Sequence, residues 1–162
     1  MRRTVIAIDP GSSSGAIVHC GPGQEQLTVA NMPPTPFDIW NHLRKLKEGD
    51  ARVVCYMEDV GTGRPGNSAR SMHTFAVHQG HLEMALLATG IPCFKVRPQE
   101  WLKALFGDKY PKGPENKDKR KQYVYDQMQR RWPEVGGFTK RQADAMAIFT
   151  WAVDLKENQD ER

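Results

Sequence analysis

The stretch at residues 4–15 constrains the fold of this chain more than any other. β-Branched residues dominate positions 4–8, and the apolar run stops at Asp9, which is typical of a buried strand. Pro10 and Gly11 end that strand, and a polar turn leads into a second apolar run at 16–18. An acid at the tip of a strand occupies the place where α/β folds hold functional residues. Asp-Pro-Gly is also a common turn sequence, so a role as a turn cap stays open for Asp9.

The remainder of the chain alternates between short apolar runs and segments with helical periodicity. This alternation predicts the α/β class. Further strands are expected near 27–32, 52–60 and 91–96, and helices near 37–47, 71–89, 99–106, 119–132 and 139–155. We expect one domain over residues 1–156, followed by a polar, disordered tail at 157–162.

Composition excludes several classes of protein. The 162 residues are 39% hydrophobic and 26% charged, enough for one compact core. No segment approaches the length of a membrane span, and Asp9 cuts the first apolar run too short for a signal peptide. The three cysteines are far apart and include no CxxC pair, which indicates free thiols in a reducing compartment. We therefore expect a cytoplasmic protein.

Two further acids occupy positions that are expected to be buried, where a carboxylate destabilises the fold unless it has a partner. Glu58 closes the apolar run at 53–57, so it also lies at a strand tip. Asp144 lies between alanines on the apolar stripe of the last predicted helix, where an unpaired carboxylate costs several kcal/mol. Mg²⁺ prefers such oxygen ligands, and two Mg²⁺ ions can hydrolyse a phosphodiester. Asp9, Glu58 and Asp144 are therefore candidate metal ligands, with Mn²⁺ as a possible substitute ion.

Basic residues concentrate in one region. Residues 109–121 contain six basic and two acidic residues, a local charge of +4 that equals the net charge of the whole chain. The glycine-rich loop at 61–70 adds Arg64 and Arg70. Both segments are candidates for binding nucleic-acid phosphates, although a solvated charged face and a merely flexible loop remain alternatives. The candidate DNA-binding residues are Arg64, Arg70, Lys117, Lys119, Arg120 and Lys121.

These pieces together resemble the RuvC Holliday-junction resolvases, nucleases of the RNase H-like superfamily. The resemblance rests on IDPGSSSGA at 8–16, the glutamate in VVCYMEDV at 53–60 and QADAMAIF at 142–149, and it covers residues 4–153. It implies a mixed five-stranded sheet flanked by helices. It also implies a homodimer that cuts four-way DNA junctions symmetrically, with Lys121 near the scissile phosphate and the segment after Glu58 near the dimer partner.

One position departs from the family pattern. The family has a further acid one helical turn before the last aspartate, and this chain has Arg141 there. An arginine cannot bind Mg²⁺, because it stays protonated and offers no lone pair. Arg141 is therefore expected to stabilise charge on the scissile phosphate, which adds it to the catalytic candidates. Two alternatives remain: Asp59 takes the place of the missing acid, or the enzyme is weakened.

Other functions fit less well. A junction-binding protein with a decayed nuclease site would not selectively keep three costly carboxylates. A nuclease acting on other branched DNA or on RNA–DNA hybrids would use the same residues. Asp-x-Gly followed by small polar residues also opens the actin and sugar-kinase superfamily, but that fold normally needs two such domains and a longer chain.

Overall fold

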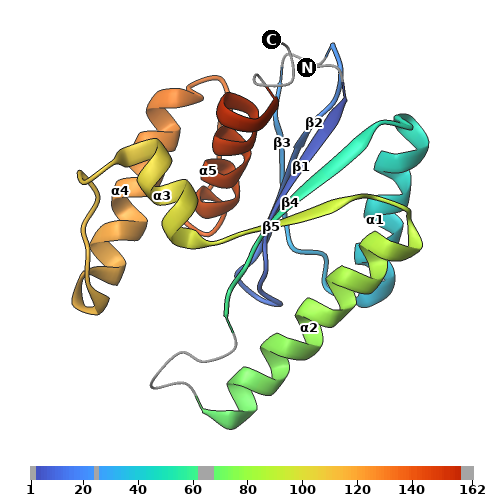
Figure 1. Cartoon of the computed structure of the whole chain (residues 1–162), viewed down its shortest axis with the longest axis horizontal. Coiled ribbons are helices and arrows are strands. Elements are labelled where there is room, and N and C mark those ends of the chain that lie inside the picture. Colours follow the sequence, from blue (N-terminus) through green and yellow to red (C-terminus); the bar gives the residue numbers. More distant parts are fainter. Residues whose placement is uncertain (1–2, 24–25, 62–67, 158–162) are drawn as a thin grey trace.

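The computed structural model describes residues 3–23, 26–61 and 68–157. Its five strands form one mixed sheet in the order β3-β2-β1-β4-β5 (Figure 1). β2 is antiparallel to β1 and β3, whereas β4 is parallel to β1 and β5. The strands are β1 (Thr4–Asp9), β2 (Ala16–Cys20), β3 (Thr28–Asn31), β4 (Val53–Glu58) and β5 (Cys93–Val96). The predicted α/β class and mixed five-stranded sheet are confirmed.

Helices cover both faces of this sheet. Figure 1 shows α1 and α2 on one face and α3, α4 and α5 on the other. The helices are α1 (Pro36–Gly49), α2 (Ala69–Ala88), α3 (Pro98–Phe106), α4 (Lys117–Arg131) and α5 (Ala143–Trp151), with a 3-10 turn at Pro114–Asn116 and a π-helical turn at Ala152–Glu157. Within the described residues, no helix is both long and apolar enough to cross a membrane.

The central strand β1 is buried on both faces because helices pack on both. Val5 and Ala7 point toward α5, whereas Ile6 and Ile8 point toward α1 and α2. This double burial explains why β1 is a continuous apolar run rather than an alternating one. Helix α5 is buried along nearly its whole length, apart from the half-buried Asp144.

The end of the chain differs from the sequence-based prediction. The last helix begins at Ala143 rather than at Thr139, because the backbone N–H of Thr139 donates to Oε1 of Gln142 at 2.8 Å. That bond closes a turn just before the helix. After Trp151 the chain continues as the π-helical turn. Of the predicted tail at 157–162, residues 158–162 lie outside the described residues.

The cysteines agree with the sequence-based prediction of free thiols. Cys20 and Cys55 are buried in β2 and β4, and neither forms a disulfide. Cys93 lies opposite Cys55 in the β4–β5 register and is exposed at the first residue of β5.

Candidate active site

Two of the predicted acids end neighbouring parallel strands. Ile8 of β1 pairs with Met57 of β4, so Asp9 and Glu58 follow at the next register position. Alternation along each strand turns both side chains to the face that carries Val5 and Val54, which is the face covered by α5. The sheet thus brings Asp9 and Glu58 to one edge and one face. Asp9 is half-buried, and Glu58 is only 7% exposed.

The turn after Asp9 is held tightly against the end of β1. The backbone N–H of Gly15 donates to the carbonyl oxygen of Gly11 at 3.0 Å, and that of Met32 donates to the carbonyl of Gly15 at 3.0 Å. A Cβ atom at Gly15 would lie 2.5 Å from the carbonyl oxygen of Asp9, closer than real Cβ atoms come. Glycine is therefore required for the turn to close beneath Asp9.

Glu58 has a buried hydrogen-bond donor from another element. Nε1 of Trp101, on α3, donates to Oε1 of Glu58 at 3.3 Å. A buried carboxylate is costly without such a partner. Trp101 was not among the predicted site residues. Its signal in the sequence is a tryptophan one helical turn after the strand that pairs with β4.

The third acid comes from the helix that covers this face. Asp144 lies in the first turn of α5, and α5 packs against β1, β2 and β4. Gln142, just before α5, donates through Nε2 to Oδ1 of Asn31 at 3.0 Å. Asn31 pairs with Ala16, and Ala16 pairs with Asp9, so this bond ties the start of α5 to the same edge of the sheet. Asn31 and Gln142 were also missed by the sequence analysis.

The three carboxylates have the chemistry that a hard divalent cation prefers, and two of them stand on rigid adjacent strands. In the described part of the chain, no group of three or more His, Cys, Asp and Glu side chains meets the geometry of a metal site. The structure thus brings Asp9 and Glu58 together by register and puts Asp144 on the helix that covers their face, but it does not gather the three described carboxylates into one metal-binding group.

The alternative acid Asp59 belongs to the other face. Its backbone N–H donates to the carbonyl of Val96 at 2.7 Å, directly beyond the end of β4. Its carboxylate acts on Lys95, whose pKa is raised first by a hydrogen bond to Glu83 of α2 and further by the charges of Glu83 and Asp59. Because α2 covers the opposite face of the sheet, Asp59 points away from Glu58.

The basic candidates that the structure describes lie near the start of α4, in the turn before α5 and in the first helical turn of α2. Lys117 and Lys119 are exposed, and Arg120 and Lys121 are half-buried, all at the beginning of α4. Arg141 is exposed in the turn that precedes α5. Lys112 also belongs to this basic segment, but it forms an ion pair with Asp108, which reduces the local excess of charge.

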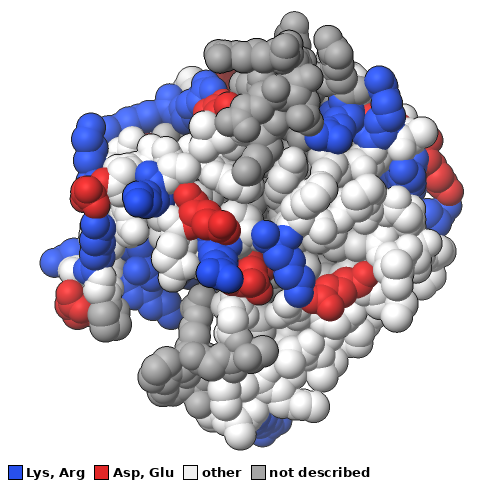
Figure 2. Space-filling view, in the orientation of Figure 1, with Lys and Arg blue, Asp and Glu red and all other residues white. Residues whose placement is uncertain are grey.

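Arg70 is exposed in the first turn of α2, and Arg64 lies outside the described residues. Figure 2 shows many Lys and Arg side chains along the edge of the molecule where Figure 1 places α4.

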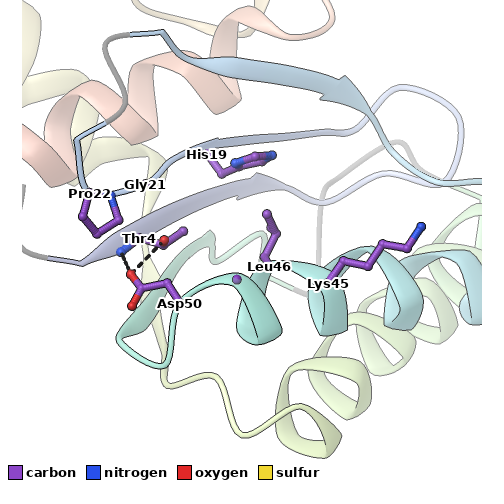
Figure 3. A pocket seen from close by; sticks show the side chains of 8 residues that line it. Thr4, His19, Gly21, Pro22, Lys45, Leu46 and Asp50 are labelled. Carbon is purple, nitrogen blue, oxygen red and sulfur yellow. Dashed lines mark hydrogen bonds between the residues drawn. The ribbon is translucent and has the colours of Figure 1, made fainter.

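A separate hollow lies at the opposite end of β1. Thr4, His19, Lys45 and Asp50 are among its lining residues, and its volume is about 190 Å³ (Figure 3). Asp50 accepts hydrogen bonds from the backbone N–H and the hydroxyl of Thr4, at 2.8 and 3.0 Å. Because Thr4 begins the strand that Asp9 ends, this hollow is remote from the strand-end acids.

Comparison with known proteins identifies the fold. No protein-family model matches the chain, and no curated protein matches it by sequence. Among solved structures, it is similar to RuvC of Thermus thermophilus at 16% identity, with a TM-score of 0.61, over 94% of this chain and 96% of that one. It is also similar to T. thermophilus RuvC in complex with a Holliday junction substrate, at 14% identity and a TM-score of 0.64, over 95% and 96% of the two chains. The chain therefore has the RNase H-like fold of the RuvC resolvases.

Proposed function

We propose that this protein is a divalent-metal-dependent endonuclease that resolves four-way DNA junctions by paired, symmetric phosphodiester cuts. The observation that carries the proposal is the placement of Asp9 and Glu58 at adjacent strand ends, on the face where α5 carries Asp144. In a chain with the RuvC fold, three acids at that edge support metal-assisted phosphodiester hydrolysis better than any other chemistry.

In this proposal Asp9, Glu58 and Asp144 hold two Mg²⁺ ions, for which Mn²⁺ can substitute. The ions would supply charge stabilisation to the phosphate oxygens and activate the attacking water. Lys121 and Arg141 act beside them as cations that stabilise the charge developing on the scissile phosphate. Hydrolysis leaves 5′-phosphate ends.

The start of α4 is the proposed DNA track. Its first turn contains Lys117 and Lys119, and Arg120 and Lys121 follow immediately. Basic residues at a helix N-terminus oppose the helix dipole and cost stability, whereas a phosphate bound there would be favoured by both the dipole and the cations. Because several basic residues at this helix start each oppose the dipole, their presence favours a role in phosphate binding over a role in stability. Arg64 and Arg70 are further proposed phosphate contacts.

The proposed enzyme is a homodimer that uses α2. The exposed apolar residues Val77 (42%), Met84 (62%) and Leu87 (74%) follow one another at helical spacing, with Gly80 between the first two. In Figure 2 the lower right of the molecule, where Figure 1 places α2, is a broad area almost without charged side chains. A second copy of this chain would bury that face and bring two sites to one junction.

We further propose that residues 1–156 act as a single domain, followed by a polar tail, and that the protein works in the cytoplasm, where its branched DNA substrate would be found.

A catalytically weakened junction-binding protein is the alternative hypothesis. It draws on one specific feature, the replacement of the expected acid by Arg141.

The direct test incubates the protein with a synthetic four-way junction, a linear duplex of the same sequence and an RNA–DNA hybrid, with Mg²⁺ or with EDTA. We expect the junction alone to be cut, at paired symmetric positions, and only with Mg²⁺. Binding of the junction without cleavage would instead support a catalytically weakened junction-binding protein. Cleavage of the RNA–DNA hybrid alone would support a ribonuclease H.

A further inference from the structure

The contact between Trp101 and Glu58 joins two nearly inaccessible side chains. Trp101 is 2% exposed and Glu58 is 7% exposed, and the bond from Nε1 to Oε1 spans 43 residues of sequence. The bond therefore depends on the tertiary fold and not on local chain geometry. Its acceptor is one of the three acids on which the proposed function depends.

A short connection between β5 and α3 positions Trp101 beside Glu58. Val96, the last residue of β5, pairs with Glu58. Pro98 then begins α3, and the carboxylate of Glu100 accepts a hydrogen bond from the backbone N–H of Arg97 at 2.8 Å. Pro and this capping bond fix the start of the helix. Trp101 lies in the first turns of α3, and its indole therefore stays close to the paired ends of β5 and β4, where Glu58 is.

The chemistry of the indole suits a partner that must hold a metal-binding carboxylate. Its N–H is a donor only, carries no charge and does not titrate. A lysine or arginine in its place would neutralise the carboxylate and compete with a cation. The indole instead fixes the orientation of the carboxylate and leaves its full negative charge in place.

We propose that Trp101 is a positioning residue that orients Glu58 for divalent-metal binding. This inference rests on the proposed function, because it takes Glu58 to be a metal ligand. Trp101 itself touches neither metal nor DNA in this proposal. Its contribution is the indole N–H that donates to Oε1 of Glu58.

The key variant is Trp101→Phe, which removes the N–H and keeps an aromatic ring. The chain offers a matched control in Trp132→Phe. Nε1 of Trp132 donates to Oγ1 of Thr150 at 2.9 Å, so this control also loses one indole hydrogen bond, but not one to an acid. Glu58→Gln serves as the reference for loss of the ligand. If Trp101→Phe does not fold, replacing Trp101 by benzothienylalanine removes the N–H with less change of shape.

Mn²⁺ binding is measured by calorimetry on the dimeric or monomeric protein as purified, without DNA. We expect Trp101→Phe to weaken Mn²⁺ binding about tenfold or more, and Trp132→Phe to change it less than about twofold. In the metal-free protein, Glu58→Gln should also shift the ¹⁵N–¹H resonance of the Trp101 indole and leave that of Trp132 in place.

The two possible failures are distinguishable. Wild-type Mn²⁺ affinity in Trp101→Phe, together with lost affinity in Glu58→Gln, would overturn the role of Trp101 and leave the proposed function intact. Absence of Mn²⁺ binding in the wild type, or unchanged binding in Glu58→Gln, would count against the metal site itself and therefore against the proposed function.

Discussion

Individual side chains at the candidate site have distinct surroundings that set distinct tasks. Glu58 is buried and bonded by an indole, whereas Asp9 is half-buried above a tight glycine turn. Asp59 follows Glu58 in sequence but serves the opposite face, beside Lys95. Of the two neighbouring acids, only Glu58 can therefore act together with Asp9.

Arg141 gives the first residue-level prediction. Because Arg141 is exposed just before α5, its replacement should leave the core undisturbed. Arg141→Ala should lower the single-turnover rate of junction cleavage on the order of 10²-fold, as loss of a cation at a developing charge does, with little change in junction binding. Lys140→Ala, an exposed neighbour, is the matched control. Undiminished turnover in Arg141→Ala would remove this residue from the mechanism.

His19 gives a second residue-level prediction, for stability. Burial, and to a smaller extent the neighbouring His42, lowers the pKa of His19 from 6.5 to about 4. Between about pH 4 and pH 6.5, His19 is therefore protonated in the unfolded chain but not in the folded protein. The free energy of unfolding is therefore highest above about pH 6.5 and falls as the pH drops toward 4. The loss is at most about 3 kcal/mol, and it is smaller to the extent that solvent reaches the imidazole ring.

Urea unfolding at pH 7 and at pH 4.5 measures this effect. The wild type should lose more stability between the two pH values than His19→Gln, which has no proton to gain. Equal losses in both proteins would show that His19 does not carry the pH dependence. His42, whose pKa is also lowered, first by burial and then by Lys45, contributes in the same direction.

At the level of elements, the turn between β1 and β2 controls the position of Asp9. Gly15→Ala would place a Cβ 2.5 Å from the carbonyl of Asp9 and 2.6 Å from backbone atoms of Gly11, so the turn must shift. We expect a loss of stability of about 1–3 kcal/mol and a clear drop in cleavage. Gly49→Ala, at an open position at the end of α1, is the control and should be nearly neutral. Normal thermal stability and activity in Gly15→Ala would contradict this account of the turn.

The elements also show what a sequence can predict. Strands β1, β2 and β4 were predictable because buried strands leave continuous apolar runs, and Asp9 and Glu58 were predictable because the runs of β1 and β4 end on acids. The start of α5 was not, since the turn at Thr139–Gln142 competes with the helix through a side-chain bond. The bond from Gln142 to Asn31 spans 111 residues, and no local pattern reports such a contact.

At the level of the whole molecule, α2 presents the exposed apolar surface on which the proposed dimer depends. We expect the double substitution of Met84 and Leu87 by glutamate to convert the dimer into a monomer, as measured by analytical ultracentrifugation. Both side chains are more than half exposed, so the fold of the monomer should survive. Phe37→Glu, also at an exposed apolar residue but on α1, is the control and should leave the dimer intact. A dimer that persists in the double variant would place the interface elsewhere.

The most direct measurement of the central claim compares Asp9→Asn with Asp59→Asn on a four-way junction. The two variants remove one charge each near the same edge, but only Asp9 shares its face with Glu58 and α5. We predict that Asp9→Asn cuts the junction at least about 10³-fold more slowly in Mg²⁺ while still binding it, and that Asp59→Asn cuts it like the wild type. Normal cutting by Asp9→Asn would contradict the assignment of this edge of the sheet as the catalytic metal site.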